Sequence, residues 1–318
     1  MATAATLKLR QVRLITAIKT PYLADGNLDI VAYDKLVDHQ IQNGVEGIIV
    51  GGTTGEGHLL SWHEHLCLIG HTKAKYADRI LIVGNTGSNS TSESVWATKK
   101  GFALGMDASL LINPYYGKTS DKGIVMHIEA AMAYGPAFIY NVPGRTGQDI
   151  KPEVMMLMKD HKHFIGVKEC VGTERIKELT GKGICCWTGN DDQMHESRRK
   201  YGAVGVISVT SNIVPGLIRR LMHDEPGEAL DAIDASLQPL YTWLFTDPNP
   251  IGVNTLLMQL GAAQPVWRLP YTFAPKEMRE KVVPLLKGIG LGHCPAFGGG
   301  VKVLEDSDFI HTMDGDAV

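Results

Sequence analysis

Long apolar runs are missing from this chain, since none approaches the roughly 20 residues that a membrane-spanning helix requires. The opening MATAATLKLRQVR also lacks the apolar core of a secretory signal, so we expect a soluble protein that is not secreted. This opening is basic, rich in small residues and free of acid, which is typical of the end of a plastid transit peptide, although it is too short to be a whole one. The opening residues alone leave targeting open.

An excess of charge of one sign is missing as well. Lys and Arg number 31 against 34 Asp and Glu, the formal net charge is -3, and no basic run or stripe occurs. Such a balance provides no electrostatic attraction for nucleic acid or for an anionic membrane. We therefore expect small molecules as partners, with neither nucleic acid nor membrane among them.

Cysteine is scarce and is not arranged for metal binding. The five cysteines form no CxxC pair, which argues against a zinc site and against a disulfide framework, and predicts buried thiols. HEHLC is not the HExxH motif, and a helical His63 and His65 would point to different faces, so we predict no metal site. The cysteines are Cys67, Cys170, Cys185, Cys186 and Cys294.

The glycine-rich GxGxxG turn of dinucleotide-binding folds is absent after the first apolar run, which disfavours the alternative of a doubly wound sheet. Eight short apolar runs alternate with helix-length amphipathic segments over about 210 residues, the size of a (β/α)8 barrel. Their apolar character on both faces predicts parallel strands buried on both sides. The runs begin near Arg13, Val45, Arg79, Ala108, Pro136, His163, Gly183 and Gly202.

Helical patterns without an intervening strand follow the eighth run. They cover 228–245, 249–261 and 274–290. We therefore predict a TIM barrel over residues 1–231 and a C-terminal helical domain over residues 232–318.

Polar residues follow the apolar runs, where the chemistry of a barrel is placed. They are Thr53, Thr54, Glu56, Asn89, Tyr115, Tyr116, Tyr140, Asn141, Arg145, Lys168, Glu169, Asn190 and Asp191.

Lys168 ends the run FIGVKEC and is the candidate nucleophile. Partial burial lowers the pKa of an ammonium group and exposes a neutral amine, which can form a Schiff base with a carbonyl compound. Tyr140 could transfer the protons that this chemistry needs, with Thr54 and Tyr116 forming a relay to water. The alternative interpretation is a solvated charge on the rim of the barrel, surrounded by half-buried tyrosine rings.

Two further motifs are suited to binding carboxylates. GGTTGEG, with Thr53 and Thr54, offers amides and hydroxyls at a turn before a helix; a threonine-capped connection is the alternative. Arg145 follows a VPG turn and could clamp the carboxylate of a second substrate, or form an ordinary surface salt bridge.

Six motifs in this order, GGTTGEG, NPYYG, YNVPGRTG, GVKEC, TGNDD and GVISVTSN, resemble the dihydrodipicolinate synthase family, and the flanking sequence resembles its plant-type branch from about Arg13 to about Ile310. The resemblance implies a class I aldolase of the pyruvate-dependent superfamily that condenses pyruvate with aspartate 4-semialdehyde to 4-hydroxy-tetrahydrodipicolinate, on the diaminopimelate route to lysine. It implies a homotetramer, a dimer of dimers, with no metal or organic cofactor. Plant-like similarity implies the chloroplast stroma, with cytoplasm as the alternative for a microbial source.

By motif, the resemblance makes Lys168 the Schiff-base residue and Tyr140 the general acid and base. Thr54 joins Tyr140 to Tyr116, which works beside the residue matching Tyr115 on an adjacent subunit. The substrate-binding positions that it implies are Thr53, Thr54, Arg145 and the backbone carbonyl of Ile207.

Inhibition by L-lysine is a further implication, because many family members bind lysine at a dimer interface. Glu93 would pair with the ammonium of the ligand, and Trp62 matches the plant type, but His58 replaces an expected glutamine. The implied site comprises His58, Trp62, His65, Asn89, Glu93 and Tyr115.

Two alternatives to this function remain. One is another pyruvate-dependent aldolase, such as an N-acetylneuraminate lyase or a keto-deoxy sugar acid aldolase, although Arg145 favours a short carboxylated aldehyde. The other is a lysine-sensing or structural paralogue without catalysis.

Overall fold

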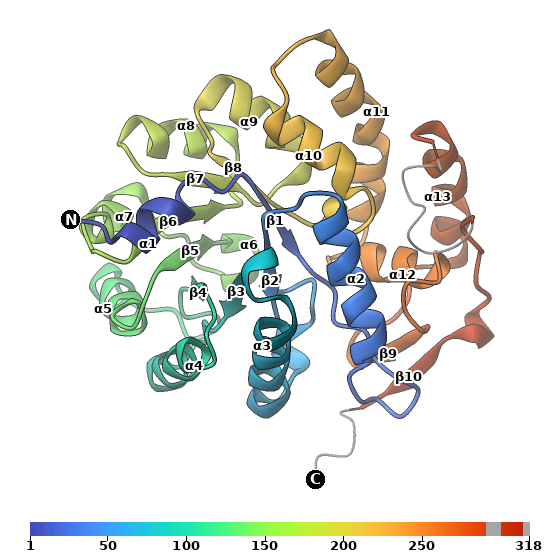
Figure 1. Ribbon diagram of the computed structural model, residues 1–318, viewed down its shortest axis with the longest axis horizontal. Coiled ribbons are helices and arrows are strands. Elements are labelled where there is room, and N and C mark those ends of the chain that lie inside the picture. Colours follow the sequence, from blue (N-terminus) through green and yellow to red (C-terminus); the bar gives the residue numbers. More distant parts are fainter. Residues whose placement is uncertain (291–299, 314–318) are drawn as a thin grey trace. The chain divides into compact units, whose positions relative to one another are not determined.

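A closed barrel of eight parallel strands, joined in chain order, organises the computed structural model, which describes residues 1–290 and 300–313 (Figure 1). This confirms the predicted TIM barrel. The strands are β1 (Leu14–Ala17), β2 (Gly47–Val50), β3 (Leu81–Asn85), β4 (Ala108–Ile112), β5 (Ala137–Asn141), β6 (Phe164–Glu169), β7 (Cys186–Thr188) and β8 (Gly205–Ser208).

Two compact units divide the chain. The first comprises residues 1–15, 46–50 and 65–208, and the second comprises residues 16–45, 51–64 and 209–318. The predicted domain boundary at residue 231 lies within helix α11 (Glu228–Leu244). The division into residues 1–231 and 232–318 stays a prediction.

Helices cover the outer side of the strands in the first unit. Ile139 and Val167 pack outward against helical residues such as Ile128 and Met155. Phe138 and Ile165 belong instead to the apolar cluster that fills the barrel. The helices of this region are α1 (Ala4–Leu9), α3 (Trp62–Tyr76), α4 (Thr91–Ala103), α5 (Asp121–Met132), α6 (Pro143–Thr146), α7 (Pro152–Met158), α8 (Thr173–Gly181) and α9 (Met194–Tyr201).

A bulge in β6 decides which way its last residues point. Ala137 pairs with Phe164, but Phe138 pairs with Gly166, so Ile165 and Gly166 both lie opposite Phe138. Strict alternation from Ile165 would turn Lys168 toward the helices. Because the bulge inserts one residue, Lys168 instead faces the barrel interior, on the same side as Tyr140.

Gly166 is required at this bulge. A Cβ atom there would lie 2.2 Å from the carbonyl oxygen of Cys185 and 2.8 Å from Cζ3 of Trp187. Since the indole of Trp187 is completely buried in the barrel, a larger residue at the bulge would displace either the strand or this ring.

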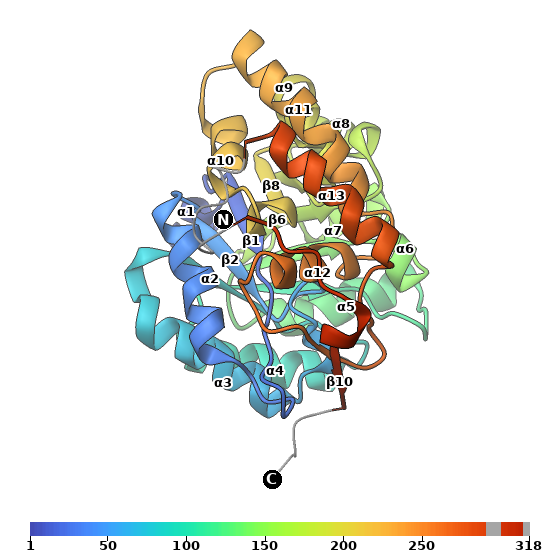
Figure 2. The same ribbon diagram turned by 90° about the vertical axis from the view of Figure 1, so that its right-hand side faces the viewer.

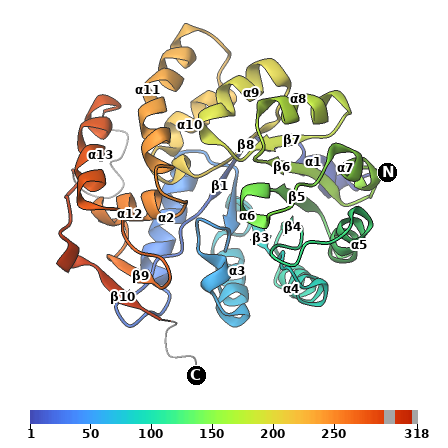
Figure 3. The ribbon, with the colours of Figure 1, turned by 180° about the vertical axis from the view of Figure 1, so that it is seen from behind.

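Helix α1 covers the amino-terminal end of β6 and was not predicted. The guanidinium of Arg10 donates to the carbonyl oxygens of Phe164 and Ile165, at 2.7 and 3.0 Å, and the Thr6 hydroxyl donates to that of Lys162 at 2.9 Å. Helix α1 lies on the near side of the strands in Figure 1. Helix α6, which follows β5, lies on the near side in Figure 3, where the molecule is seen from behind. The two helices therefore occupy opposite ends of the strands.

The second unit contains the C-terminal helices. Helices α11 and α13 pack side by side (Figure 2), where the indole of Trp243 donates to the carbonyl oxygen of Met278 at 2.7 Å. The three C-terminal helical patterns correspond to α11, α12 and α13, which confirms these predictions. The helices of this unit are α2 (Ile30–Gln42), α10 (Pro215–His223), α11 (Glu228–Leu244), α12 (Ile251–Gln259) and α13 (Lys276–Gly288).

The prediction that no strand separates the C-terminal helices is wrong. Strand β9 (Val266–Arg268) lies between α12 and α13 and pairs in parallel with β10 (Ile310–Thr312). Each strand has three residues, too few for a periodic pattern, and its partner is more than 40 residues away. Trp267 of β9 is fully buried in a small apolar cluster with Met258 and Phe309.

The prediction of buried thiols is wrong for Cys67 and is met only in part at Cys170 and Cys185. Cys186 is buried and Cys170 and Cys185 are half-buried, but Cys67 is exposed on α3. Helix α3 turns its apolar side, with Leu68 and Ile69, inward. Cys294 lies outside the described residues.

Candidate active site

Lys168 and Tyr140 form a close pair inside the first unit. They are register partners on β6 and β5, and Nζ of Lys168 lies 4.3 Å from the centroid of the Tyr140 ring. Each side chain is only 7% exposed. The structure thus places the predicted nucleophile and the predicted proton carrier in contact at the carboxyl ends of neighbouring strands.

The surroundings of Lys168 favour its neutral form. Burial is the largest effect and lowers the pKa of the ammonium group below its ordinary value, and the positive charge of Arg145 lowers it further. The negative charge of Asp191 acts in the opposite direction, as that of Cys170 does only once its thiol is ionised. A lysine with a lowered pKa presents a larger fraction of free amine near neutral pH, which is the form that attacks a carbonyl carbon.

Gly189 and Cys170 define the space around the lysine chain. A Cβ atom on Gly189, directly after β7, would lie 2.9 Å from Cε of Lys168 and 2.3 Å from Sγ of Cys170. The side chains of Cys170 and Tyr140 are hydrogen-bonded, and burial raises the pKa of the thiol to about 11, so the thiol stays neutral near pH 7. Cys170 therefore packs beside the lysine without carrying a charge, a neighbour that the sequence analysis had not considered.

Arg145 and the two tyrosines of NPYYG lie at exposed positions of the first unit. Arg145 is exposed on the short helix α6. Tyr115 is half-buried, whereas Tyr116 is 94% exposed and has a φ of 67°, in the left-handed region. Ile207 of β8 is also a predicted substrate-binding residue of the first unit, and it is completely buried in the barrel interior.

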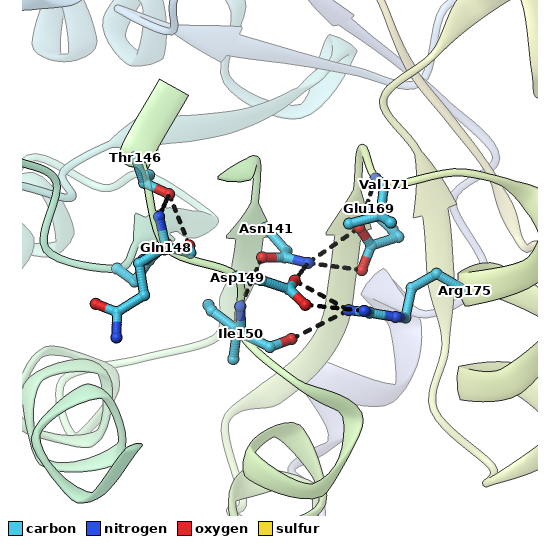
Figure 4. A network of polar contacts seen from close by, with 9 residues as sticks. Asn141, Thr146, Gln148, Asp149, Ile150, Glu169, Val171 and Arg175 are labelled. Carbon is cyan, nitrogen blue, oxygen red and sulfur yellow. Dashed lines mark hydrogen bonds and ion pairs between the residues drawn. The ribbon is translucent and has the colours of Figure 1, made fainter. Parts of the chain in front are cut away.

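Gln148 holds the loop that carries both tyrosines. Its side-chain oxygen accepts from the backbone N–H of Thr119 at 2.9 Å, and its carbonyl oxygen accepts from the amide of Asn113 at 3.1 Å. Thr146 in turn donates to that carbonyl oxygen at 2.8 Å (Figure 4). The tyrosine loop is therefore hydrogen-bonded to the segment that follows Arg145.

Thr54 lies in the second unit and is 1% exposed, beside a half-buried Thr53. The amide of Asn249 donates to the Thr54 hydroxyl oxygen at 3.2 Å, and that of Asn254 donates to its backbone carbonyl oxygen at 3.4 Å. Because the hydroxyl oxygen already accepts a hydrogen bond, its proton is oriented for donation. The role of Thr54 in a proton relay stays a prediction.

A buried ion pair next to this turn escaped the sequence analysis. Nζ of Lys19 lies 3.5 Å from Oε1 of Glu56, and both side chains are completely buried. Burial lowers the pKa of Lys19 and raises that of Glu56, while their mutual attraction opposes both shifts. Asn254 donates to the same carboxylate at 2.6 Å, which satisfies one of its oxygens. The signal in the sequence was Lys19, a charged residue within the apolar stretch LITAIKTP, because a buried cation needs an anionic partner.

The residues of the implied lysine site lie on both units. His58 is exposed and its ring meets the edge of the Tyr271 ring at 5.4 Å, while Trp62 is half-buried. His65 is 2% exposed, 3.3 Å from the carbonyl oxygen of Val50. The others are Asn89 and Glu93, both exposed, and the half-buried Tyr115. Their assembly into one site stays a prediction.

A metal ion needs several His, Cys, Asp or Glu side chains close together, and the structure describes residues 1–290 and 300–313. In these two ranges no group of three His, Cys, Asp or Glu side chains is placed to hold a metal ion. No helix in the same ranges is long and apolar enough to cross a membrane.

The parallel barrel and its strand-end lysine, packed on a tyrosine, define an enzyme of the class I aldolase type. Residues 10–289 match the model of the Dihydrodipicolinate synthetase family. The chain belongs to this family.

Individual relatives agree. The chain is 57% identical over 304 residues to 4-hydroxy-tetrahydrodipicolinate synthase 1, chloroplastic, of Arabidopsis thaliana, covering 95% of this chain and 82% of the relative. Among solved structures, dihydrodipicolinate synthase of Cyanidioschyzon merolae with lysine bound has a TM-score of 0.84 at 30% identity, covering 89% of this chain and 99% of that one. The chloride-inhibited enzyme of Acinetobacter baumannii complexed with pyruvate has a TM-score of 0.82 at 33% identity, with coverages of 88% and 99%.

Proposed function

We propose that this chain acts as a 4-hydroxy-tetrahydrodipicolinate synthase, which condenses pyruvate with aspartate 4-semialdehyde in lysine biosynthesis. The observation that carries the proposal is the Lys168–Tyr140 pair at the carboxyl ends of β6 and β5. Membership in the family and the pyruvate complex of the Acinetobacter baumannii relative support it.

The chemistry follows from the residues. The neutral amine of Lys168 attacks the ketone carbon of pyruvate, and loss of water from the carbinolamine leaves an iminium ion. The iminium withdraws electrons, so a methyl proton leaves and the resulting enamine attacks the aldehyde carbon. Tyr140 transfers the protons, with Thr54 and Tyr116 as its relay, and Arg145 binds the carboxylate of the semialdehyde.

Borohydride reduction in the presence of pyruvate tests the first step. We expect one pyruvyl adduct per chain by intact mass, mapped to Lys168 by peptide analysis, and none in Lys168→Ala. A folded wild-type protein that stays unmodified would contradict the aldolase mechanism and favour a non-catalytic paralogue.

Substrate comparison tests the second step. Condensation with aspartate 4-semialdehyde should be fast, whereas cleavage of N-acetylneuraminate or of keto-deoxy sugar acids should be negligible. Arg145→Gln should raise KM for the semialdehyde, because it removes a bidentate carboxylate partner. Efficient cleavage of a sugar acid would assign the chain to another branch of the superfamily.

Inhibition by L-lysine is part of the proposal. The Cyanidioschyzon merolae relative was solved with lysine bound, and Glu93 of this chain is exposed at the start of α4, where a ligand ammonium group could pair with it. L-lysine should inhibit the condensation, and Glu93→Ala should abolish inhibition while leaving the uninhibited rate intact. His58→Gln tests the residue that departs from the plant pattern.

We further propose a homotetramer, arranged as a dimer of dimers, in which Tyr115 of one subunit lies beside Tyr116 of another. The 94% exposure of Tyr116 in the single chain supports a partner that covers it. Sedimentation equilibrium should give a mass of four chains, and an active monomer would contradict the shared relay.

For a plant or algal source we propose the chloroplast stroma, since the Arabidopsis relative is chloroplastic. Localisation of a fluorescent fusion in the source cell tests this.

A further inference from the structure

Asn141 lies at the centre of a hydrogen-bonded network at the carboxyl ends of β5 and β6 (Figure 4). It follows Tyr140 on β5, and its amide donates to Oδ1 of Asp149 at 2.8 Å and to both carboxylate oxygens of Glu169 at 3.0 Å. Its side-chain oxygen accepts from the backbone N–H of Ile150 at 3.0 Å. One completely buried side chain thus joins two strands to the segment after Arg145.

Glu169 occupies the matching position on β6. It follows Lys168, pairs in register with Asn141 and is completely buried. Its carboxylate also accepts from the backbone N–H of Val171 at 2.8 Å, which fixes the turn after the strand. Because side chains alternate along a strand, holding Asn141 and Glu169 on one face fixes the directions of Tyr140 and Lys168 on the other.

Arg175 of α8 anchors the network from outside. Its guanidinium binds both carboxylate oxygens of Asp149, at 3.0 and 2.8 Å, in the bidentate geometry. Burial would raise the pKa of Asp149, but the hydrogen bonds from Arg175 and Asn141 outweigh it and lower that pKa. Asp149 therefore stays ionised and keeps accepting at neutral pH.

We propose that Asn141 and Glu169 are positioning residues for the Schiff-base reaction, which hold Tyr140 and Lys168 in the geometry for attack on pyruvate. In the described network, the polar side-chain atoms of these two residues bond to neither Lys168 nor Tyr140. They act instead through the backbone at the strand ends. This inference rests on the proposed function, to which it adds the residues that orient Lys168.

Two substitutions at one position separate hydrogen bonding from charge. Glu169→Gln keeps an oxygen that can accept from Asn141 and Val171, so the rate of borohydride trapping of pyruvate on Lys168 should stay within about threefold of wild type. Glu169→Leu removes every acceptor, and its trapping rate should fall by about 10- to 100-fold at all pH values, because the misaligned amine reacts poorly even when neutral. KM for the semialdehyde should change less than kcat.

The control is Thr6→Val, which removes a hydrogen bond at the amino-terminal end of the same strand. It should lower the temperature of unfolding while leaving the trapping rate near that of wild type. Three outcomes would overturn the inference: a normal trapping rate in folded Glu169→Leu, an equal loss in Glu169→Gln, or an equal loss in Thr6→Val. If Glu169→Leu does not fold, Asn141→Ala serves instead, with the same expected loss. A wild-type protein without any adduct would instead refute the proposed function itself.

Discussion

At the scale of single residues, the reactivity of Lys168 depends on a few charged neighbours. Burial lowers the pKa of its ammonium group, and Arg145 lowers it further, whereas Asp191 raises it. The position of the lysine could be predicted, because it ends an apolar run before a polar turn. Its environment could not, because the β6 bulge and the packing of Cys170 depend on neighbouring strands that no local pattern specifies.

Substituting Arg145 and Asp191 should therefore shift the pH dependence in opposite directions. Loss of the positive charge in Arg145→Gln raises the pKa of Lys168, so the rate of adduct formation should begin to rise at a higher pH than in wild type. Asp191→Asn should shift the profile to lower pH. Trapping rates measured from pH 5 to 10 test this, and parallel shifts in both variants would contradict the assignment.

Gly189 should tolerate no side chain. The methyl group of Gly189→Ala would displace Cε of Lys168 or Sγ of Cys170, so the trapping rate should fall by about tenfold or more in a folded protein. Adding Cys170→Ala removes the sulfur atom at 2.3 Å and should restore part of the rate. A double variant no faster than Gly189→Ala would show that the thiol is not the obstacle.

At the scale of elements, the prediction succeeded where a segment carries its own periodic pattern. All eight barrel strands and the three C-terminal helices lie where the apolar patterns predicted them. The failures are α1, β9 and β10, which are short and are stabilised by partners far along the chain. The contact of Asn141 with Asp149 likewise depends on a loop position that the sequence does not reveal, and its contact with Glu169 depends on the register of β5 and β6.

Helix α1 should contribute to stability without contributing to catalysis. Arg10→Ala leaves the carbonyl oxygens of Phe164 and Ile165 without this partner, which should cost about 1–3 kcal/mol of unfolding free energy. The urea midpoint should fall, and kcat should stay at the wild-type value, because these contacts lie at the amino-terminal end of β6. A large loss of kcat at unchanged stability would contradict this division.

The GGTTGEG turn should depend on the buried pair of Lys19 and Glu56. Lys19→Met leaves the Glu56 carboxylate buried without its cation, and should cost about 3–5 kcal/mol. Combining it with Glu56→Gln removes the uncompensated charge and should recover most of the loss. Urea unfolding of the four proteins of this cycle measures the coupling, and additive effects would show that the pair is not coupled.

At the scale of the whole molecule, buried histidines should limit stability in acid. Burial lowers the pKa of His65 to about 4, and burial has the same effect on His39, also to about 4. Unfolded histidine titrates near pH 6.5. As the pH falls, protons therefore bind the unfolded chain before the folded one. The stability that the neutral histidines contribute is fully present above about pH 6.5 and is lost as the pH falls toward 4.

The loss for His65 alone should be on the order of 3 kcal/mol over this range. His65→Gln should flatten the dependence of the unfolding midpoint on pH. Equal slopes in wild type and His65→Gln would refute the assignment.

The covering of β6 by α1 has a practical consequence. Since α1 lies at the amino-terminal end of the strand and Lys168 near its carboxyl end, the first residues of the chain leave the first unit on the side away from the reacting amine. An affinity tag or a surface linker fused there would tether the protein so that the carboxyl end of β6, with Lys168, faces the solution. Immobilised in this orientation, the protein should accept substrate from the bulk solution as readily as it does untethered.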